Sequence, residues 1–460
     1  MKKLVVLGGG GVRSPFLAKS LISNAKDLHI SEIVFMDDNE DKLRIFGGIS
    51  RTVANAIDPE VKFWTTTSVE EAVKDAHYVI TTLRVEQDKG RFQDEKIAQE
   101  YGLLGQETTG VGGFAMSLRS IPMLKKYCKI INELADPNVL IFNFTNPSGL
   151  VTQALRSEGF DNVYGICDGP SHFIETLEEV LGVTHDEFDI TCYGLNHLSF
   201  YRDAKVNGRP MMDELLNHPD LYKKTDMRLF DKELVEILGN ELPNEYLYFF
   251  FYHDKVIRSI EVNGGARGQL IKDINERMLA SINEVDPEDT NEIFNIYMKH
   301  IMERERSYFA IESGETRPEE FPVPTLQEYV QQPDKGGYSG IALNFIKAFH
   351  GDKKTKMTLM VPNNGAIKEL QDDDVIEITC DIEKGIVSPR QISDIPELQM
   401  HFIKTIKRFE RLTVEAINEK NRLKAVEALM IHPLINSYNI AAQIVDELLE
   451  LYKDHIGQWS

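Results

Sequence analysis

The chain has 460 residues, of which 42% are hydrophobic and 27% are charged, so it is long enough for two soluble globular domains. Its formal net charge of -22 excludes the basic surface that nucleic-acid-binding proteins use. No run approaches eighteen consecutive apolar residues and the four cysteines are scattered, so we expect a cytoplasmic protein with no membrane or nucleic-acid partner.

The first elements along the chain predict a nucleotide-binding unit. A buried strand at 4–7 is followed by a helix at 15–25, and the loop between them consists of Gly8, Gly9, Gly10, Gly11, Val12 and Arg13. Glycines let the backbone approach a pyrophosphate at the helix N-terminus. A second strand at 32–36 ends at Asp37, where an acid that binds ribose hydroxyls and disfavours NADP is expected. We therefore expect NAD; the alternative is an ordinary strand–helix turn with Asp37 as a helix cap.

Strands and helices continue to alternate beyond this unit. Further helices are expected at 42–56, from 68 onwards and at 116–135, and further strands at 61–65, 78–82, 139–144, 163–166 and 188–193. This order implies right-handed crossovers between parallel strands. We predict an α/β fold in which residues 1–195 form a Rossmann-like, doubly wound parallel sheet that binds NAD.

The pattern changes in the second half, where residues 196–460 are expected to form a mixed α+β domain for catalysis and oligomerisation. Helices dominate from 210 to 347, and 318–324 is the most loop-like stretch. Two late strands are expected at 356–361 and 375–380, and two long amphipathic helices at 398–436 and 438–452.

Two residues suited to a transition metal follow predicted strands. Cys167 comes after the strand at 163–166, and His197 after the strand at 188–193. Strand ends are where α/β proteins assemble their sites, and a thiolate with an imidazole forms half of a metal shell. The alternative is a buried cysteine and a hydrogen-bonded core histidine, as Cys192 in a similar strand illustrates.

Several short phrases occur in a fixed order along the chain. They are Leu83-Arg84-Val85, Gly105-Gln106-Glu107-Thr108, Gly110-Val111-Gly112-Gly113, Asn143-Phe144-Thr145-Asn146-Pro147, Cys167-Asp168, Gly194-Leu195-Asn196-His197 and Asn363-Asn364-Gly365-Ala366-Ile367. Together with the glycine loop, this set resembles family 4 of the glycoside hydrolases, the NAD- and manganese-dependent enzymes mostly active on 6-phosphoglycosides. The resemblance runs from residue 4 to about residue 450 and implies the lactate/malate dehydrogenase scaffold.

The resemblance implies an oxidation–elimination mechanism. NAD oxidises the hydroxyl on sugar carbon 3, which makes the hydrogen on carbon 2 acidic. A divalent metal, usually Mn²⁺, stabilises the enediolate that forms when a base removes this proton. The glycosidic oxygen then leaves, water adds to the unsaturated sugar, and the retained NADH reduces the ketone.

The resemblance also implies roles for individual residues. Cys167 and His197 match the metal ligands, and Tyr246 matches the base. Asp168 matches the acid that protonates the leaving oxygen in the family's α-glucosidase branch. The residues expected to contact the sugar are Asn146, Arg84, Glu107 and Arg267. Candidates for the 6-phosphate are Arg13, Ser14 and Arg84, because helix N-termini and arginine forks both suit phosphate.

The resemblance leaves the substrate open within one class, a 6-phosphorylated disaccharide or glucoside. Asp168 is typical of the 6-phospho-α-glucosidases, whereas the phrases around Arg84, Glu107 and His197 are closer to the 6-phospho-β-glucosidases, which we favour. A third alternative is an NAD-dependent 2-hydroxy-acid dehydrogenase on the same scaffold. Family habit and the long C-terminal helices predict a homodimer or homotetramer.

Overall fold

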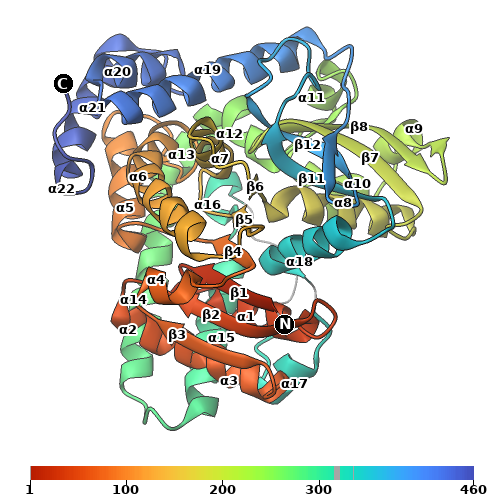
Figure 1. The fold of residues 1–460 in the computed structure, drawn as a ribbon. Helices are drawn as coiled ribbons and strands as arrows, with labels where there is room; N and C mark the ends of the chain where they lie inside the picture. Colours follow the sequence, from red (N-terminus) through yellow and green to blue (C-terminus); the bar gives the residue numbers. More distant parts are fainter. Residues whose placement is uncertain (1, 315–321, 335) are drawn as a thin grey trace.

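The computed structural model describes residues 2–314, 322–334 and 336–460 (Figure 1). Six parallel strands form its N-terminal half: β1 (Lys2–Leu7), β2 (Ile30–Met36), β3 (Lys62–Thr66), β4 (Tyr78–Thr81), β5 (Leu140–Asn143) and β6 (Val163–Gly165). They lie in the order β3-β2-β1-β4-β5-β6, which is that of a doubly wound NAD-binding sheet. The predicted fold class is confirmed.

Burial of the strands explains why this half of the sheet is parallel. Leu4, Val5, Val6 and Leu7 are all fully buried, as expected for a strand covered on both faces. The helices that connect the strands are α1 (Ser14–Asn24), α2 (Glu40–Lys42), the π-helix η1 (Leu43–Gly47), α3 (Gly48–Ile57), α4 (Val69–Val73), α5 (Gln87–Glu100), α6 (Gly110–Leu134), α7 (Ser148–Ser157) and α8 (Asp168–Leu181).

The sheet continues beyond β6 with antiparallel strands. They are β7 (Phe188–Leu195), β8 (Leu198–Val206), β9 (Arg209–Pro210), β10 (Leu242–Pro243), β11 (Thr355–Pro362), β12 (Val375–Glu383) and β13 (Ile386–Pro389). β11 joins the two parts by pairing Met360 with Gly165 of β6, where a Cβ on the glycine would lie 2.6 Å from that of Met360. The described residues thus form one thirteen-stranded sheet. The expected domain boundary at residue 195 falls in the β7–β8 turn and stays a prediction.

Helices make up most of the rest of the second half. The longer ones are α13 (His253–Val262), α14 (Arg267–Asn283), α15 (Thr290–Arg306), α18 (Gly337–His350), α19 (Glu397–Glu419), α20 (Arg422–Ile431) and α21 (Tyr438–Leu451). The shorter ones are α9 (Met212–Leu216), α10 (Leu221–Lys224), η2 (Asp226–Leu229), α11 (Lys232–Ile237), η3 (Glu245–Leu247), α12 (Tyr248–Phe251), α16 (Ala310–Ser313), α17 (Leu326–Gln331) and α22 (Lys453–Ile456). α14 and α15 pack against α5 and α3 of the first half (Figure 1).

The structure departs from the expected elements at the α19–α20 break and at α5 and β8. The helix expected at 398–436 is wrong in extent, because Lys420 adopts φ 51° and Asn421 caps a new helix, α20. α5 and β8 were not expected. Most of the loop expected at 318–324 lies outside the described residues. No helix in the described part of the chain is both long and apolar enough to cross a membrane.

Candidate active site

A cavity of about 940 Å³ lies beside the point between β1 and β4 where the strand order reverses. Ligands of doubly wound sheets bind here, because the loops that follow the strands diverge to opposite faces. Every site residue expected from the sequence, apart from Gly9, lines this cavity: Gly8, Gly10, Gly11, Val12, Arg13, Asp37, Arg84, Glu107, Asn146, Cys167, Asp168, His197, Tyr246 and Arg267.

The glycine loop after β1 is held by contacts that leave no room for side chains. Gly8 has φ +100°, and a Cβ there would lie 2.5 Å from the carbonyl oxygen of Thr82. Gly10 donates its N–H to Oδ2 of Asp37 at 2.9 Å, which ties the loop to the end of β2. Gly9 packs against Phe35 on β2 instead of lining the cavity, so its contribution is close packing.

Two further observations fit a dinucleotide to this loop. The hydroxyl of Ser14, the first residue of α1, is buried and has no hydrogen-bond partner among the described residues. A phosphate at the helix N-terminus would supply an acceptor for it. Asp37 places a carboxylate at the end of β2, where ribose hydroxyls are bound in sheets of this type, and burial raises its pKa.

Cys167 and His197 lie close enough to share one metal ion. Sγ of Cys167 is 3.9 Å from Nε2 of His197, whereas a cation bonded to both would allow up to about 4.4 Å. Burial lowers the pKa of His197 to about 4, so the ring is neutral at pH 7 and its nitrogen can coordinate. No group of three or more His, Cys, Asp or Glu side chains in the described residues could hold a metal. A cation held by this pair therefore keeps positions for sugar or water oxygens.

Backbone geometry presents these two side chains to the cavity. His197 lies in the tight turn of the β7–β8 hairpin and has φ 63°. Gly194, three residues earlier, has φ +133°, and a Cβ there would lie 2.4 Å from the carbonyl oxygen of Leu198. Cys167 follows β6 and precedes the first residue of α8. The two side chains thus come from the parallel and the antiparallel parts of the sheet.

Tyr246 lies directly against the Cys167–His197 pair. Its ring stacks on that of His197, with centroids 3.7 Å apart and planes 5° apart. The side chain of Asn244 accepts a hydrogen bond from the Tyr246 N–H at 2.9 Å and fixes the start of η3. Burial raises the pKa of the Tyr246 phenol, and the carboxylates of Glu245 and Glu107 add to this effect. A cation next to the ring would act in the opposite direction.

Asp168 adjoins Cys167 at the first turn of α8 and also faces the cavity. Burial raises its pKa, while Arg13 and His172 oppose that rise. A carboxyl group with a raised pKa retains its proton at higher pH, which suits a general acid.

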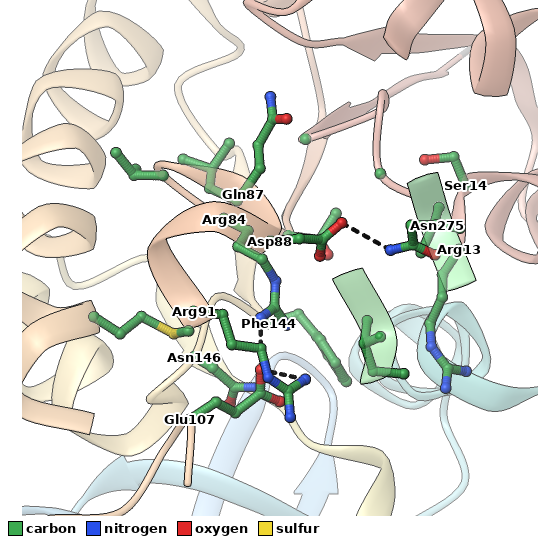
Figure 2. A pocket seen from close by; sticks show the side chains of 18 of the residues that line it. Arg13, Ser14, Arg84, Gln87, Asp88, Arg91, Glu107, Phe144, Asn146 and Asn275 are labelled. Carbon is green, nitrogen blue, oxygen red and sulfur yellow. Dashed lines mark hydrogen bonds and ion pairs between the residues drawn. The ribbon is translucent and has the colours of Figure 1, made fainter. Parts of the chain in front are cut away.

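Glu107 is held between two arginines. Its Oε2 lies 2.5 Å from Nη1 of Arg84 and 2.9 Å from Nη1 of Arg91 (Figure 2). Burial alone would raise the pKa of Glu107, but the two guanidinium groups outweigh it and hold the pKa well below the ordinary range. Arg91 is itself buried and makes a second ion pair with Glu95 at 2.8 Å. The predicted sugar contacts Arg84 and Glu107 therefore form one ion-paired unit.

A second group of arginines faces the same cavity. Arg13, Arg267 and Arg304 all line it. Burial, together with the positive charges of Arg13 and Arg267, lowers the pKa of Arg304 to about 9. The buried Nε of Arg267 has no hydrogen-bond partner among the described residues. Concentrated positive charge with an unsatisfied donor fits an anionic ligand such as a phosphate group.

The Asn143–Pro147 phrase contains residues that join two strands and one residue that lines the cavity. Asn143 is fully buried and accepts a hydrogen bond from the Thr81 hydroxyl at 2.9 Å. The hydroxyl of Thr145 accepts from the Leu83 N–H at 2.9 Å. These bonds join the ends of β4 and β5 and leave Asn146 lining the cavity.

Comparison with known proteins decides the family. The family model described as "Family 4 glycosyl hydrolase" matches residues 3–183, and "Family 4 glycosyl hydrolase C-terminal domain" matches residues 192–435. The chain belongs to family 4 of the glycosyl hydrolases. The resemblance stated from the motifs is confirmed, and this family 4 enzyme is a hydrolase, which excludes the 2-hydroxy-acid dehydrogenase alternative.

Relatives of this family 4 glycosyl hydrolase match it over nearly its whole length. The 6-phospho-beta-glucosidase BglT of Thermotoga maritima is 30% identical over 455 residues, covering 99% of each chain. The 6-phospho-beta-glucosidase of Escherichia coli K12 is 30% identical, covering 97% of this chain and 94% of that one. A structure of the T. maritima 6-phospho-beta glucosidase with manganese, NAD+ and glucose-6-phosphate is 27% identical, with a TM-score of 0.81 and 99% coverage of both chains.

Reasoning from the sequence did not find all the charged residues of this family 4 enzyme's cavity. Arg91 lies on α5, which was not expected, and Arg304 lies on α15 without a distinguishing motif. Asp88 and Asn275 also line the cavity and are joined by a 2.8 Å hydrogen bond (Figure 2). Asp88 and Asn275 are 187 residues apart in the sequence, so no local motif could indicate that they meet.

Proposed function

We propose that the protein is a 6-phospho-β-glucosidase that requires NAD and a divalent metal such as Mn²⁺. The observation that carries this proposal is the convergence, in one cavity, of the glycine loop, the Cys167–His197 pair and Tyr246. The names of the T. maritima and E. coli relatives support the substrate, and the T. maritima structure supports both cofactors.

Two parts of the chain hold the cofactors in this proposal. The glycine loop, Ser14 and Asp37 bind NAD, while Cys167 and His197 bind the metal. When bound, NAD accepts and returns a hydride, and the divalent cation stabilises negative charge on the sugar as a Lewis acid.

Tyr246 and Asp168 carry the proton transfers. Tyr246 accepts the proton from sugar carbon 2, and its stacking on His197 places the phenol against the metal-binding pair, where positive charge favours the phenolate. Asp168 adjoins Cys167 and donates a proton to the departing glycosidic oxygen, and burial raises the pKa of its carboxyl group, which favours the protonated form.

Polar side chains around these groups orient the phosphorylated sugar. Asn146 and the Arg84–Glu107 unit contact its hydroxyls, and Arg267 binds close to the metal. The arginine group of Arg13, Arg267 and Arg304 receives phosphate, since an anion relieves the mutual repulsion of these guanidinium groups.

The same mechanism on 6-phospho-α-glucosides is the second candidate, and Asp168 favours it. A carboxyl group beside the metal ligand can protonate an α-linked leaving oxygen. The maltose-6'-phosphate glucosidase MalH of Clostridium acetobutylicum is 27% identical, close to the 30% of the β-glucosidases. The two anomers are therefore compared directly in the test below.

The test measures hydrolysis of p-nitrophenyl 6-phospho-α- and β-glucosides by enzyme stripped of nucleotide and metal. We expect activity only when NAD and Mn²⁺ are both restored, with the β-anomer preferred. Cys167→Ser should abolish Mn²⁺-dependent activity and leave NAD binding unchanged, whereas Cys192→Ala, a buried cysteine outside the cavity, should remain active. Activity of the stripped enzyme without additives would overturn the proposal.

We infer further that the enzyme is a cytoplasmic homodimer or homotetramer. All four cysteines are free, which fits a reducing compartment. The long C-terminal helices supply surfaces on which copies of the chain can associate, and light scattering at known concentration checks the mass.

A further inference from the structure

A buried carboxylate lies behind the metal-binding pair, on the side away from the cavity. Glu377, on β12, is only 1% exposed and does not line the cavity. It stands opposite Gly194 in the β12–β7 pairing, and its Oε2 accepts a hydrogen bond from the Ser199 hydroxyl at 2.8 Å. A buried polar group of this kind is costly unless it is hydrogen-bonded.

Asn196 connects Glu377 to both metal ligands. Its Nδ2 donates to Oε1 of Glu377 at 3.1 Å, and its Oδ1 accepts from the Gly149 N–H at 3.3 Å. The same side chain hydrogen-bonds to Cys167. Because Asn196 immediately precedes His197 in the hairpin turn, fixing its amide fixes the position from which the imidazole projects.

We propose that Glu377 is a positioning residue for the metal centre, acting through Asn196 to orient Cys167 and His197. This role rests on the proposed metal-dependent function. Removing a carboxylate that supports metal ligands in this indirect way weakens metal affinity by about 10- to 100-fold.

The test compares Mn²⁺ binding, by electron paramagnetic resonance titration, in full-length wild type, Glu377→Gln and the control Glu241→Gln. Glu241 is also a buried carboxylate, but it is bound by Tyr193 and Arg202, away from the cavity. We expect Glu377→Gln to weaken Mn²⁺ binding by about 10- to 100-fold, with NAD binding retained and the control like wild type. With Co²⁺ as a probe, the thiolate-to-cobalt absorption band should weaken or shift only in Glu377→Gln.

A second variant covers the case in which Glu377→Gln does not fold. Asn196→Ala breaks the same connection from a partly exposed position and should also weaken Mn²⁺ binding and alter the Co²⁺ spectrum. If both variants keep the Mn²⁺ affinity and the cobalt spectrum of the wild type, the role of Glu377 is overturned and the proposed function stands. If Glu377→Gln is unfolded, the same result in Asn196→Ala alone overturns that role. Failure of the wild-type protein to bind Mn²⁺ overturns the proposed function itself, and this role with it.

Discussion

Glu107 is the residue whose loss should cost the most stability near the cavity. It pairs with Arg84 and with Arg91, whose side chain is only 5% exposed. Glu107→Gln leaves Arg91 with only one of its two carboxylate partners, and removing one member of a buried ion pair costs about 3–5 kcal/mol. We expect the free energy of unfolding, measured in urea at pH 7, to fall by about this amount.

The control for this prediction is Glu303→Gln, which breaks an ion pair with Arg277 whose side chains are 44% and 55% exposed. Its effect should stay below about 1 kcal/mol. The pKa of Glu107 is lowered in the folded state, so its contribution is complete above its unfolded pKa of about 4.3 and is lost as pH falls below that value. Equal effects of the two variants at pH 7 would contradict the central role of Glu107.

The residues that could be predicted from the sequence are those with local signals. Cys167 and His197 follow strands, and motifs around them pointed to a known family. Arg91 and Glu377 carried no such signal, because Arg91 lies on α5, which was not expected, and Glu377 contacts a partner distant in sequence. Glu377 meets Asn196 across 181 residues, and only the pairing of β12 with β7 brings them together. Residues that orient ligands through tertiary contacts therefore required the structure.

At the scale of elements, the break between α19 and α20 offers a direct test of helix capping. Lys420 ends α19 in the left-handed region, and the Asn421 side chain accepts a hydrogen bond from the Lys424 N–H at 3.2 Å. Asn421→Ala removes this cap and should lower the free energy of unfolding by about 1 kcal/mol, whereas Asn421→Ser, which keeps an acceptor, should have little effect. Urea titrations of both variants test this, and equal values would show that the cap contributes nothing.

The same break explains why one long helix was predicted from the sequence. Apolar residues recur at helical spacing on both sides of Lys420, so periodicity alone continues through it. Strands were easier to predict, because the runs at 4–7 and 139–142 are apolar throughout. β8 was missed because its buried residues, such as Phe200 and Tyr201, are followed by an exposed polar end that obscures the strand pattern.

At the scale of the whole molecule, the two halves of the sequence depend on each other. β11 covers the edge of β6, and α14 packs against α5. The cavity takes its glycine loop from the first half and His197, Tyr246 and Arg304 from the second. The C-terminal helix α22 also returns to the first half, where His455 pairs with Glu86 at 2.6 Å and both residues line the cavity. These contacts favour cooperative unfolding over separate melting of 1–195 and 196–460.

The two tryptophans allow this cooperativity to be measured. Trp64 lies on β3, at one end of the sheet, and Trp459 lies at the C-terminal end of the chain. Each single variant keeps one tryptophan, so the fluorescence of Trp64→Phe reports on Trp459 and that of Trp459→Phe reports on Trp64. During urea unfolding the two variants therefore report on opposite halves of the chain. We expect the two variants to unfold with the same urea midpoint. NAD at 100 times its Kd should stabilise both variants by about 2.7 kcal/mol, because a ligand that binds the native state stabilises everything that unfolds together with its site. Separate midpoints would show instead that 1–195 unfolds as an independent domain. In that case NAD would raise only the midpoint reported by Trp64, which is measured in Trp459→Phe.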